Sequence, residues 1–415
     1  MTSSSLHVLI IGGGLGGLCL AQGLKKAGIS VAVYERERTP SDRLQGYRIH
    51  IEPQGNLALH ACLPPDLFEV YRATADRPGN GLRIVTEQLR EISFFPTPAY
   101  EGSDPAKLDL AVSRISLRKI LLFGLENLVH FDKTFTHYQE GPDGRVTAFF
   151  GDGTSVVGDV LVGADGGHSP VRTQLLPQAP RVPTGVVAIM GKLPWSEERR
   201  DALFISGRFD GPTTILGPKG HGMFTGLFDF TPLPQEYARA SADQQERAPQ
   251  PALFVDTTGS YLFWALIARR EKYPFEQDPQ LLDGQALQQV ALMMVQGWHP
   301  HLQQMVRESD PTSVIYKPLH AATEVSAWQT KRITLLGDAI HSMPPTRGIG
   351  GNTALRDASL LAQQLIAARN GEKLLLQAIH NYEAEMITYG FAAVRESIQG
   401  QEMMVAENSG AFYTG

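Results

Sequence analysis

Three glycines near the start of the chain have the spacing of a phosphate-binding loop. Gly12, Gly14 and Gly17 follow the apolar run 8–11, which is typical of a buried parallel strand. In such a loop the first glycine allows the tight turn, the second lets the backbone approach a pyrophosphate, and the third lets the next helix pack on the strand. The pattern predicts a helix over 15–27 whose first N–H groups point at phosphates. The predicted cofactor-binding residues here are Gly12, Gly14, Leu15, Gly16 and Gly17.

An acidic residue follows at the distance that a ribose contact requires. The second apolar run, 29–34, ends at Glu35, which lies 23 positions after Gly12. A carboxylate there binds the two ribose hydroxyls and disfavours a ribose that carries a 2′-phosphate. The next residue, Arg36, is either an adenine contact or a solvated surface side chain.

A second signature lies near the other end of the chain. Residues 331–336 are strand-like, and Asp338 then stands beyond the carboxyl end of that strand, where ligands bind in parallel sheets. Its carboxylate can accept hydrogen bonds from ribityl hydroxyls. The segment 348–353 opens a helix whose free N–H groups stabilise negative charge on a reduced flavin. The predicted flavin contacts are Gly350, Gly351 and Asn352. Together the two signatures predict one long cofactor, non-covalent FAD, held at both ends.

The middle of the chain carries a third turn with a carboxylate. Residues 160–162 form an apolar strand, and Asp165 follows in the turn before a helix. That carboxylate either braces the cofactor loop through backbone N–H groups or belongs to an ordinary strand-to-helix turn.

Composition excludes several classes of protein. The 415 residues are 42% apolar and 19% charged with a formal charge of −6, which is typical of a globular protein and gives no reason to expect nucleic-acid binding. The two cysteines and scattered histidines fit no metal pattern, so we expect no metal and a reducing, cytoplasmic location. No apolar stretch reaches the about 20 residues of a membrane span. We expect a monomer or weak dimer.

The order of predicted elements indicates an α/β fold with an insertion. A Rossmann-like FAD-binding domain is predicted in two parts, 1–180 and 281–415, and the second part includes C-terminal helices over 353–369 and 372–400. Between them, 181–280 is rich in strands and turns and predicts an antiparallel sheet that covers the substrate.

The three signatures, GGGLGG with Glu35, GADGGHSPVR, and LLGDAIHSMPP with GIGGNTALRDA, resemble those of the class A flavoprotein monooxygenases, which share the para-hydroxybenzoate hydroxylase fold. The resemblance implies FAD, NADPH or NADH as a transient reductant, and O₂ activated as a C4a-(hydro)peroxyflavin. It also implies hydroxylation or epoxidation of an aromatic or polyketide-like small molecule. The sequence departs from the usual pattern at Ile349, where the family often has Gln, and in GDAIH, where GDAAH is common.

The resemblance also assigns individual residues. Arg114 matches an arginine beside the flavin ribityl and pyrophosphate, and Asp165 and Arg172 match a motif associated with FAD and the pyridine nucleotide. Arg48 aligns with the segment beside the isoalloxazine ring. We expect Arg48 and His221 as catalytic candidates. Substrate contacts are expected at Arg208, His221, Phe224, Pro344 and Pro345.

Other functions remain open at this point. A flavoprotein reductase of the geranylgeranyl-reductase type and a non-catalytic flavin-binding protein would carry the same cofactor signatures. A flavin-dependent halogenase is disfavoured because the four tryptophans never form a W-x-W-x-I-P stretch.

Overall fold

The structure is a computed structural model. It describes residues 6–40, 48–76, 79–97, 100, 102–196, 211–228, 249–256 and 259–407.

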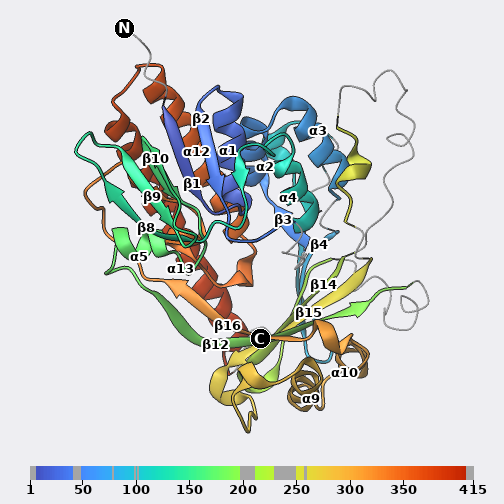
Figure 1. Ribbon diagram of the computed structural model, residues 1–415. Helices are drawn as coiled ribbons and strands as arrows, with labels where there is room; N and C mark the ends of the chain where they lie inside the picture. The colour runs from blue at the N-terminus through green and yellow to red at the C-terminus, as the bar shows by residue number, and fades with distance from the viewer. Residues whose placement is uncertain are drawn as a thin grey trace.

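A five-stranded parallel sheet forms the first layer, in the order β17-β11-β1-β2-β7. Its strands are β1 (His7–Ile11), β2 (Ser30–Tyr34), β7 (Val129–His130), β11 (Val160–Gly163) and β17 (Ile333–Leu335). The apolar runs of the sequence become these strands because both faces of the sheet are covered. Helices lie on one face and a small antiparallel sheet on the other (Figure 1). The small sheet contains β8 (Phe135–Glu140), β9 (Val146–Phe150) and β10 (Ser155–Gly158).

The helices of this domain come from both ends of the chain. They are α1 (Leu15–Lys26), α2 (Pro53–Cys62), α3 (Pro65–Thr74), α4 (Arg114–Leu122), α5 (Pro170–Leu175), α11 (Asp338–His341), α12 (Gly350–Arg369) and α13 (Leu375–Val405). A two-stranded ladder, β3 (Arg48–Ile51) with β6 (Leu110–Ser113), lies beside them. Cys19 of α1 and Cys62 of α2 are both buried free thiols.

A seven-stranded sheet forms the second domain, in the order β16-β12-β15-β14-β13-β4-β5. Its strands are β4 (Gly81–Thr86), β5 (Glu91–Pro96), β12 (Arg181–Pro194), β13 (Thr213–Leu216), β14 (His221–Phe228), β15 (Tyr261–Arg269) and β16 (Ile315–Ala322). The sheet extends beyond the expected range 181–280, because β4 and β5 come from the first part of the chain and β16 from the last. All its pairs are antiparallel except β13 with β4.

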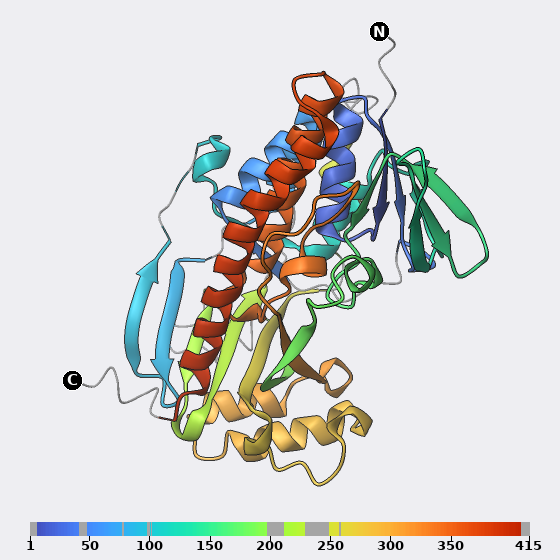
Figure 2. The same cartoon turned by 90° about the vertical axis from the view of Figure 1, so that its left-hand side faces the viewer.

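Different parts of the chain pack against the two faces of this large sheet. Helices α9 (Gly284–Met294) and α10 (Pro300–Arg307) pack on one face around the buried Trp264, and the dinucleotide domain lies on the other side (Figure 1). The long helix α13 runs from the first domain down to the sheet (Figure 2). Short 3₁₀ turns complete the chain: η1 (Pro105–Lys107), η2 (Pro218–Gly220), η3 (Pro251–Leu253), η4 (Arg270–Lys272), η5 (Pro279–Leu281), η6 (Pro311–Ser313) and η7 (Pro345–Arg347).

Candidate functional site

The first glycine loop has the geometry that its sequence predicts. Gly12 has φ +109°, and a Cβ there would overlap the carbonyl oxygen of Ala164 in the turn after β11. A Cβ on Gly17 would overlap the carbonyl oxygen of Gly12, so the turn and the close helix packing both require glycine. Gly16 serves packing as well, since its Cβ would lie 2.8 Å from Leu336 Cδ1.

The N-terminus of α1 is open. Its N-cap residue, Gly14, has no side chain to accept a hydrogen bond from the first turn, and a Cβ there would meet nothing within 4 Å. The first turn also lacks acidic residues. The free N–H groups and the positive end of the helix dipole are therefore available to an anionic group.

Glu35 lies beside this loop at the end of β2. Its side chain is buried and accepts hydrogen bonds from the backbone N–H groups of Gly13, at 2.6 Å, and Glu37, at 3.0 Å. The neighbouring Arg36 is exposed.

Arg118 is a loop contact that the sequence reasoning missed. This buried arginine of α4 donates to the carbonyl oxygens of Gly13, at 3.3 Å, and Pro40, at 2.5 Å, and pairs with Glu37 at 3.0 Å. The predicted Arg114, one helical turn earlier, is the first residue of α4 and is half-buried. The i, i+4 spacing of the two arginines was the signal that could have found Arg118.

The second signature forms a sharp turn after β17. Gly337 has φ +62°, and Asp338 begins the short helix α11 with an exposed carboxylate. The turn is held by Asp357 of α12, which is fully buried and was not among the predicted residues. Asp357 accepts hydrogen bonds from Gly337 N at 2.7 Å, His341 Nε2 at 2.6 Å and the Tyr389 hydroxyl at 2.5 Å.

The buried His341 is therefore paired with a carboxylate. Burial alone would lower the pKa of this imidazole, but the charge and hydrogen bond of Asp357 outweigh that effect and raise the pKa. Through this contact with Asp357, His341 braces the turn after β17.

The N-terminus of α12 is also open. Its N-cap residue, Ile349, provides no side-chain cap, and a Cβ on Gly351 would meet nothing within 4 Å. The Asn352 side chain is engaged elsewhere: it donates to His50 O at 2.9 Å and accepts from Glu52 N at 3.0 Å. Asn352 thus ties α12 to the end of β3, so only its backbone remains for the predicted cofactor contact.

The middle motif connects the two glycine turns. The Asp165 Oδ2 atom accepts from Val171 N at 3.3 Å, whereas its buried Oδ1 atom has no hydrogen-bond partner within the described ranges. Burial raises the pKa of this carboxyl group. Arg172 donates to Ala339 O at 3.1 Å and to Gly167 O at 3.2 Å, which joins this motif to the Asp338 turn.

A basic pocket opens beside this motif. It has a volume of about 380 Å³, and Arg172, Arg181, His168 and His320 contribute its basic side chains. Arg181 contacts the His168 imidazole at 3.3 Å and donates to Ser342 Oγ at 3.1 Å. Burial and the charge of Arg181 lower the pKa of both histidines, so the positive charge resides on the two arginines. The sequence reasoning missed Arg181 and both histidines.

Arg48 lies where the two domains meet. It is the first residue of β3, pairs with Asp76 at 3.0 Å, and stands opposite Ser113 in the β3-β6 ladder. The Ser113 hydroxyl donates to the buried Asp256, which precedes β15.

The structure places His221, a predicted catalytic and substrate residue, beneath the helices that cover the large sheet. His221 is buried on the face of the large sheet covered by α9 and α10, where its Nε2 atom lies 3.1 Å from Met294 O. Its ring stacks on Trp298 with centroids 5.2 Å apart. Phe224 lies on the opposite face, because side chains three positions apart in a strand point to opposite sides.

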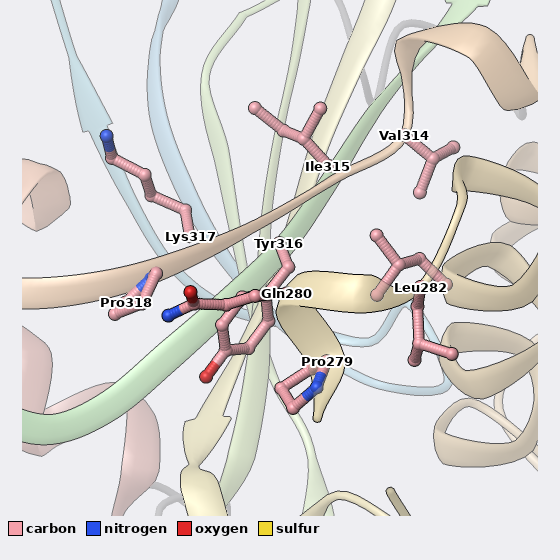
Figure 3. Close-up of a pocket in the computed structure, with 9 residues that line it drawn as sticks. Pro279, Gln280, Leu282, Val314, Ile315, Tyr316, Lys317 and Pro318 are labelled. Carbon is pink, nitrogen blue, oxygen red and sulfur yellow. The ribbon is translucent and has the colours of Figure 1, made fainter. Parts of the chain in front are cut away.

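The other predicted substrate residues differ in their exposure to solvent. Pro344 is buried and Pro345 is exposed at the start of η7, between the Asp338 turn and α12. Arg208 lies outside the described residues. A further groove of about 360 Å³, formed by η5, α9 and β16, contains none of the predicted site residues (Figure 3). In the ranges that the structure describes, no group of three or more His, Cys, Asp or Glu residues could hold a metal ion.

The residues present fit FAD. Two uncapped helix N-termini, those of α1 and α12, follow strands β1 and β17 of one parallel sheet and lie at its carboxyl edge. Glycines leave space at both, and the Asp165 Oδ1 atom supplies an unpaired buried acceptor between them. At this edge Glu35 follows β2 and Asp338 follows β17, with β1 and β11 between those two strands.

Comparisons with known proteins agree with this geometry. The FAD binding domain model matches residues 295–397, and the NAD(P)-binding Rossmann-like domain model matches residues 10–73. A solved structure from Photorhabdus luminescens, assigned as an FAD-containing monooxygenase, has 32% sequence identity and a TM-score of 0.83. The match covers 97% of this chain and 99% of that one. The chain belongs to the family of FAD-dependent monooxygenases.

Two curated relatives come from fungi. The dual O-methyltransferase/FAD-dependent monooxygenase CTB3 of Cercospora beticola is 31% identical over 98% of this chain, which spans only 47% of that protein. The chain thus covers about half the length of the first such relatives. The FAD-dependent monooxygenase thnD of Trichoderma harzianum is 29% identical over 96% of this chain and 94% of its own length. None of the described helices is long and apolar enough to cross a bilayer.

Proposed function

We propose that the chain is a single-component FAD-dependent monooxygenase that uses NADH or NADPH and O₂ to hydroxylate or epoxidise an aromatic or polyketide-like small molecule. The observation that carries the proposal is the pair of open helix N-termini at one sheet edge. The names of the fungal relatives favour this class of reaction.

When bound, FAD would accept a hydride from the nicotinamide and pass the electrons to O₂. The protein supplies position and charge. The N–H groups at the start of α12 would stabilise negative charge on a reduced flavin ring, and Asp338 would bind the ribityl chain. Arg48 holds the ring or the substrate at the domain junction, and the large sheet excludes water from the reacting centre.

The basic pocket is the proposed docking site for the phosphates of the reductant. Of its two arginines, Arg172 is buried and Arg181 is half-buried, and Arg172 belongs to the motif that the family associates with the pyridine nucleotide. An Arg181→Ala variant should bind FAD normally and have a higher KM for NAD(P)H, because the pocket loses a phosphate partner. Arg395→Ala, which removes an exposed arginine paired with Glu324, is the matched control. Equal KM values in the parent and in Arg181→Ala would exclude the pocket.

The function is tested on the purified chain. Denaturation should release FAD, and incubation with a panel of phenols and polyketides under ¹⁸O₂ should consume NAD(P)H and give a product containing one ¹⁸O atom. Release of FMN would refute the adenine-end assignment. Bound FAD without NAD(P)H oxidation for any ligand would favour a non-catalytic flavoprotein, and alkene reduction without O₂ would favour a reductase.

A further inference from the structure

A lysine stands among aromatic rings on the large sheet. Strand β12 places Lys192 opposite Phe263 of β15, and the Lys192 Nζ atom lies 4.3 Å from the centroid of the Tyr261 ring. Neither the cofactor signatures nor the family motifs assign a role to this residue.

The strand alternation determines which face Lys192 occupies. Ile189 and Leu193 belong to the core beneath α9 and α10, whereas Met190 packs with Met404 of α13 on the opposite face. Because alternate side chains share a face, Lys192 lies with Met190 on the side turned toward the dinucleotide domain (Figure 1).

The same face carries four aromatic side chains. The Phe228 ring lies 5.0 Å from Tyr261 and 6.0 Å from Phe263, and Phe224 lies 6.4 Å from Phe263. Three of these rings, all but the buried Tyr261, are partly exposed. We call Phe224, Phe228, Tyr261 and Phe263 the aromatic face. Planar apolar molecules gain stacking and burial on such a surface.

The cation lies on β12, beside the β15 strand of this aromatic face. Lys192 is half-buried, and the negative charge of Asp256 acts on its ammonium group. Asp256 also accepts from Ser113, the residue opposite Arg48 in the β3-β6 ladder. Desolvation lowers the pKa of Lys192 and the charge of Asp256 opposes that effect. A partly desolvated ammonium gains from contact with an anionic oxygen.

We propose that Lys192 is the specificity-determining residue of the substrate site, and that its ammonium group binds an ionised oxygen of an aromatic substrate lying on the aromatic face. This inference rests on the proposed function. The aromatic face selects a planar ring system, and Lys192 selects an acidic oxygen on it, a phenolate or a carboxylate. A neutral ether of the same ring would lose the ionic contact and keep the stacking.

The test measures binding, which is independent of turnover. Isothermal titration of the FAD-loaded protein uses 2-naphthol, 2-naphthoic acid and 2-methoxynaphthalene, which share a ring system and differ in the oxygen group. At least one acidic probe should bind about tenfold or more tightly than the methyl ether, because hydrogen bonds to charged groups contribute at least that factor. Whether the naphthol or the naphthoate is preferred distinguishes a phenolate from a carboxylate partner.

Three variants test whether the preference for an acidic probe depends on Lys192. Lys192→Met should abolish the preference for the acidic probe and leave the affinity for the methyl ether unchanged, and Lys192→Arg should retain the preference. Lys107→Met is the matched control, since Lys107 also lies over a tyrosine ring, 5.9 Å from the centroid of Tyr100, but is exposed. FAD content should be equal in all four proteins.

Two results would overturn the proposal: an undiminished acidic preference in Lys192→Met, or no preference in the parent, including no binding of any probe. Absence of FAD from the parent would instead refute the proposed function, so the two failures are distinguishable.

Discussion

The hydrogen bonds of Asp357 lead to a quantitative prediction for the Asp357→Asn variant. The fully buried carboxylate holds Gly337 N, His341 and Tyr389 around the Asp338 turn. Breaking a buried ion pair by removing one partner costs about 3–5 kcal/mol. Asparagine retains one acceptor, so we expect a loss near about 3 kcal/mol. For a chain of 415 residues, with an unfolding entropy of about 2.1 cal/mol/K per residue, this lowers the melting temperature by about 3–4 °C.

The pH dependence of this stability loss tests whether it comes from the ion pair between Asp357 and His341. In the parent the pKa of His341 is raised, so its stabilisation is present below the unfolded histidine pKa of about 6.5 and is lost as pH rises through the folded value. In Asp357→Asn, burial alone lowers the pKa of His341, and the folded state is destabilised as pH falls below about 6.5. The difference in melting temperature between parent and variant should therefore be larger at about pH 5.5 than at about pH 8.

Differential scanning fluorimetry of the apoprotein across this pH range measures both effects. Tyr389→Phe is the control, because it removes one hydrogen bond of Asp357 and leaves the pair with His341 intact. Its smaller loss of stability should be independent of pH. A pH-independent difference for Asp357→Asn, or a difference of less than about 2 °C, would refute the reasoning.

Three further predictions concern the candidate site. Asp338→Ala should weaken FAD binding more than Asp165→Ala, by about tenfold, because Asp338 is proposed to bind the ribityl hydroxyls directly; flavin fluorescence titration measures this, and equal affinity in Asp338→Ala and the parent would contradict it. Arg48→Ala should keep FAD but convert less NAD(P)H to oxygenated product and release more H₂O₂; unchanged product and peroxide yields would remove Arg48 from the site. His221→Ala should lower the melting temperature without changing kcat/KM, since His221 packs on Trp298 away from the cofactor, and a selective loss of activity would restore it as a site residue.

Local features of the site could be predicted from the sequence because their causes are local. The turn at Gly12, the packing at Gly17 and the placement of Glu35 each depend on a few adjacent residues. The boundary between α2 and α3 also has a local cause, because the adjacent prolines Pro64 and Pro65 interrupt a helix.

The remaining features depend on contacts between distant segments. The sequence does not show that β4 and β5 join a sheet formed mainly by residues 181–322, because strand pairing across such distances leaves no local pattern. Asp357 belongs to the motif GIGGNTALRDA, but its role could not be read from that motif because its partner Tyr389 comes from another helix, α13. The strand alternation was readable for His221 and Phe224, since two side chains three positions apart cannot share a face of one strand.

Helix α13 connects the two domains, because it makes side-chain contacts with both of them. Its 31 residues, each rising about 1.5 Å, form a continuous rod of about 46 Å (Figure 2). Midway along it, Tyr389 bonds Asp357, and Gly390 admits the His341 ring so closely that a Cβ would lie 2.7 Å from Cδ2. At its far end Glu402 pairs with Arg269 of the large sheet at 2.6 Å. Because α13 is one uninterrupted helix that contacts both regions, a displacement of the large sheet would be transmitted along the helix axis to the turn that carries Asp338.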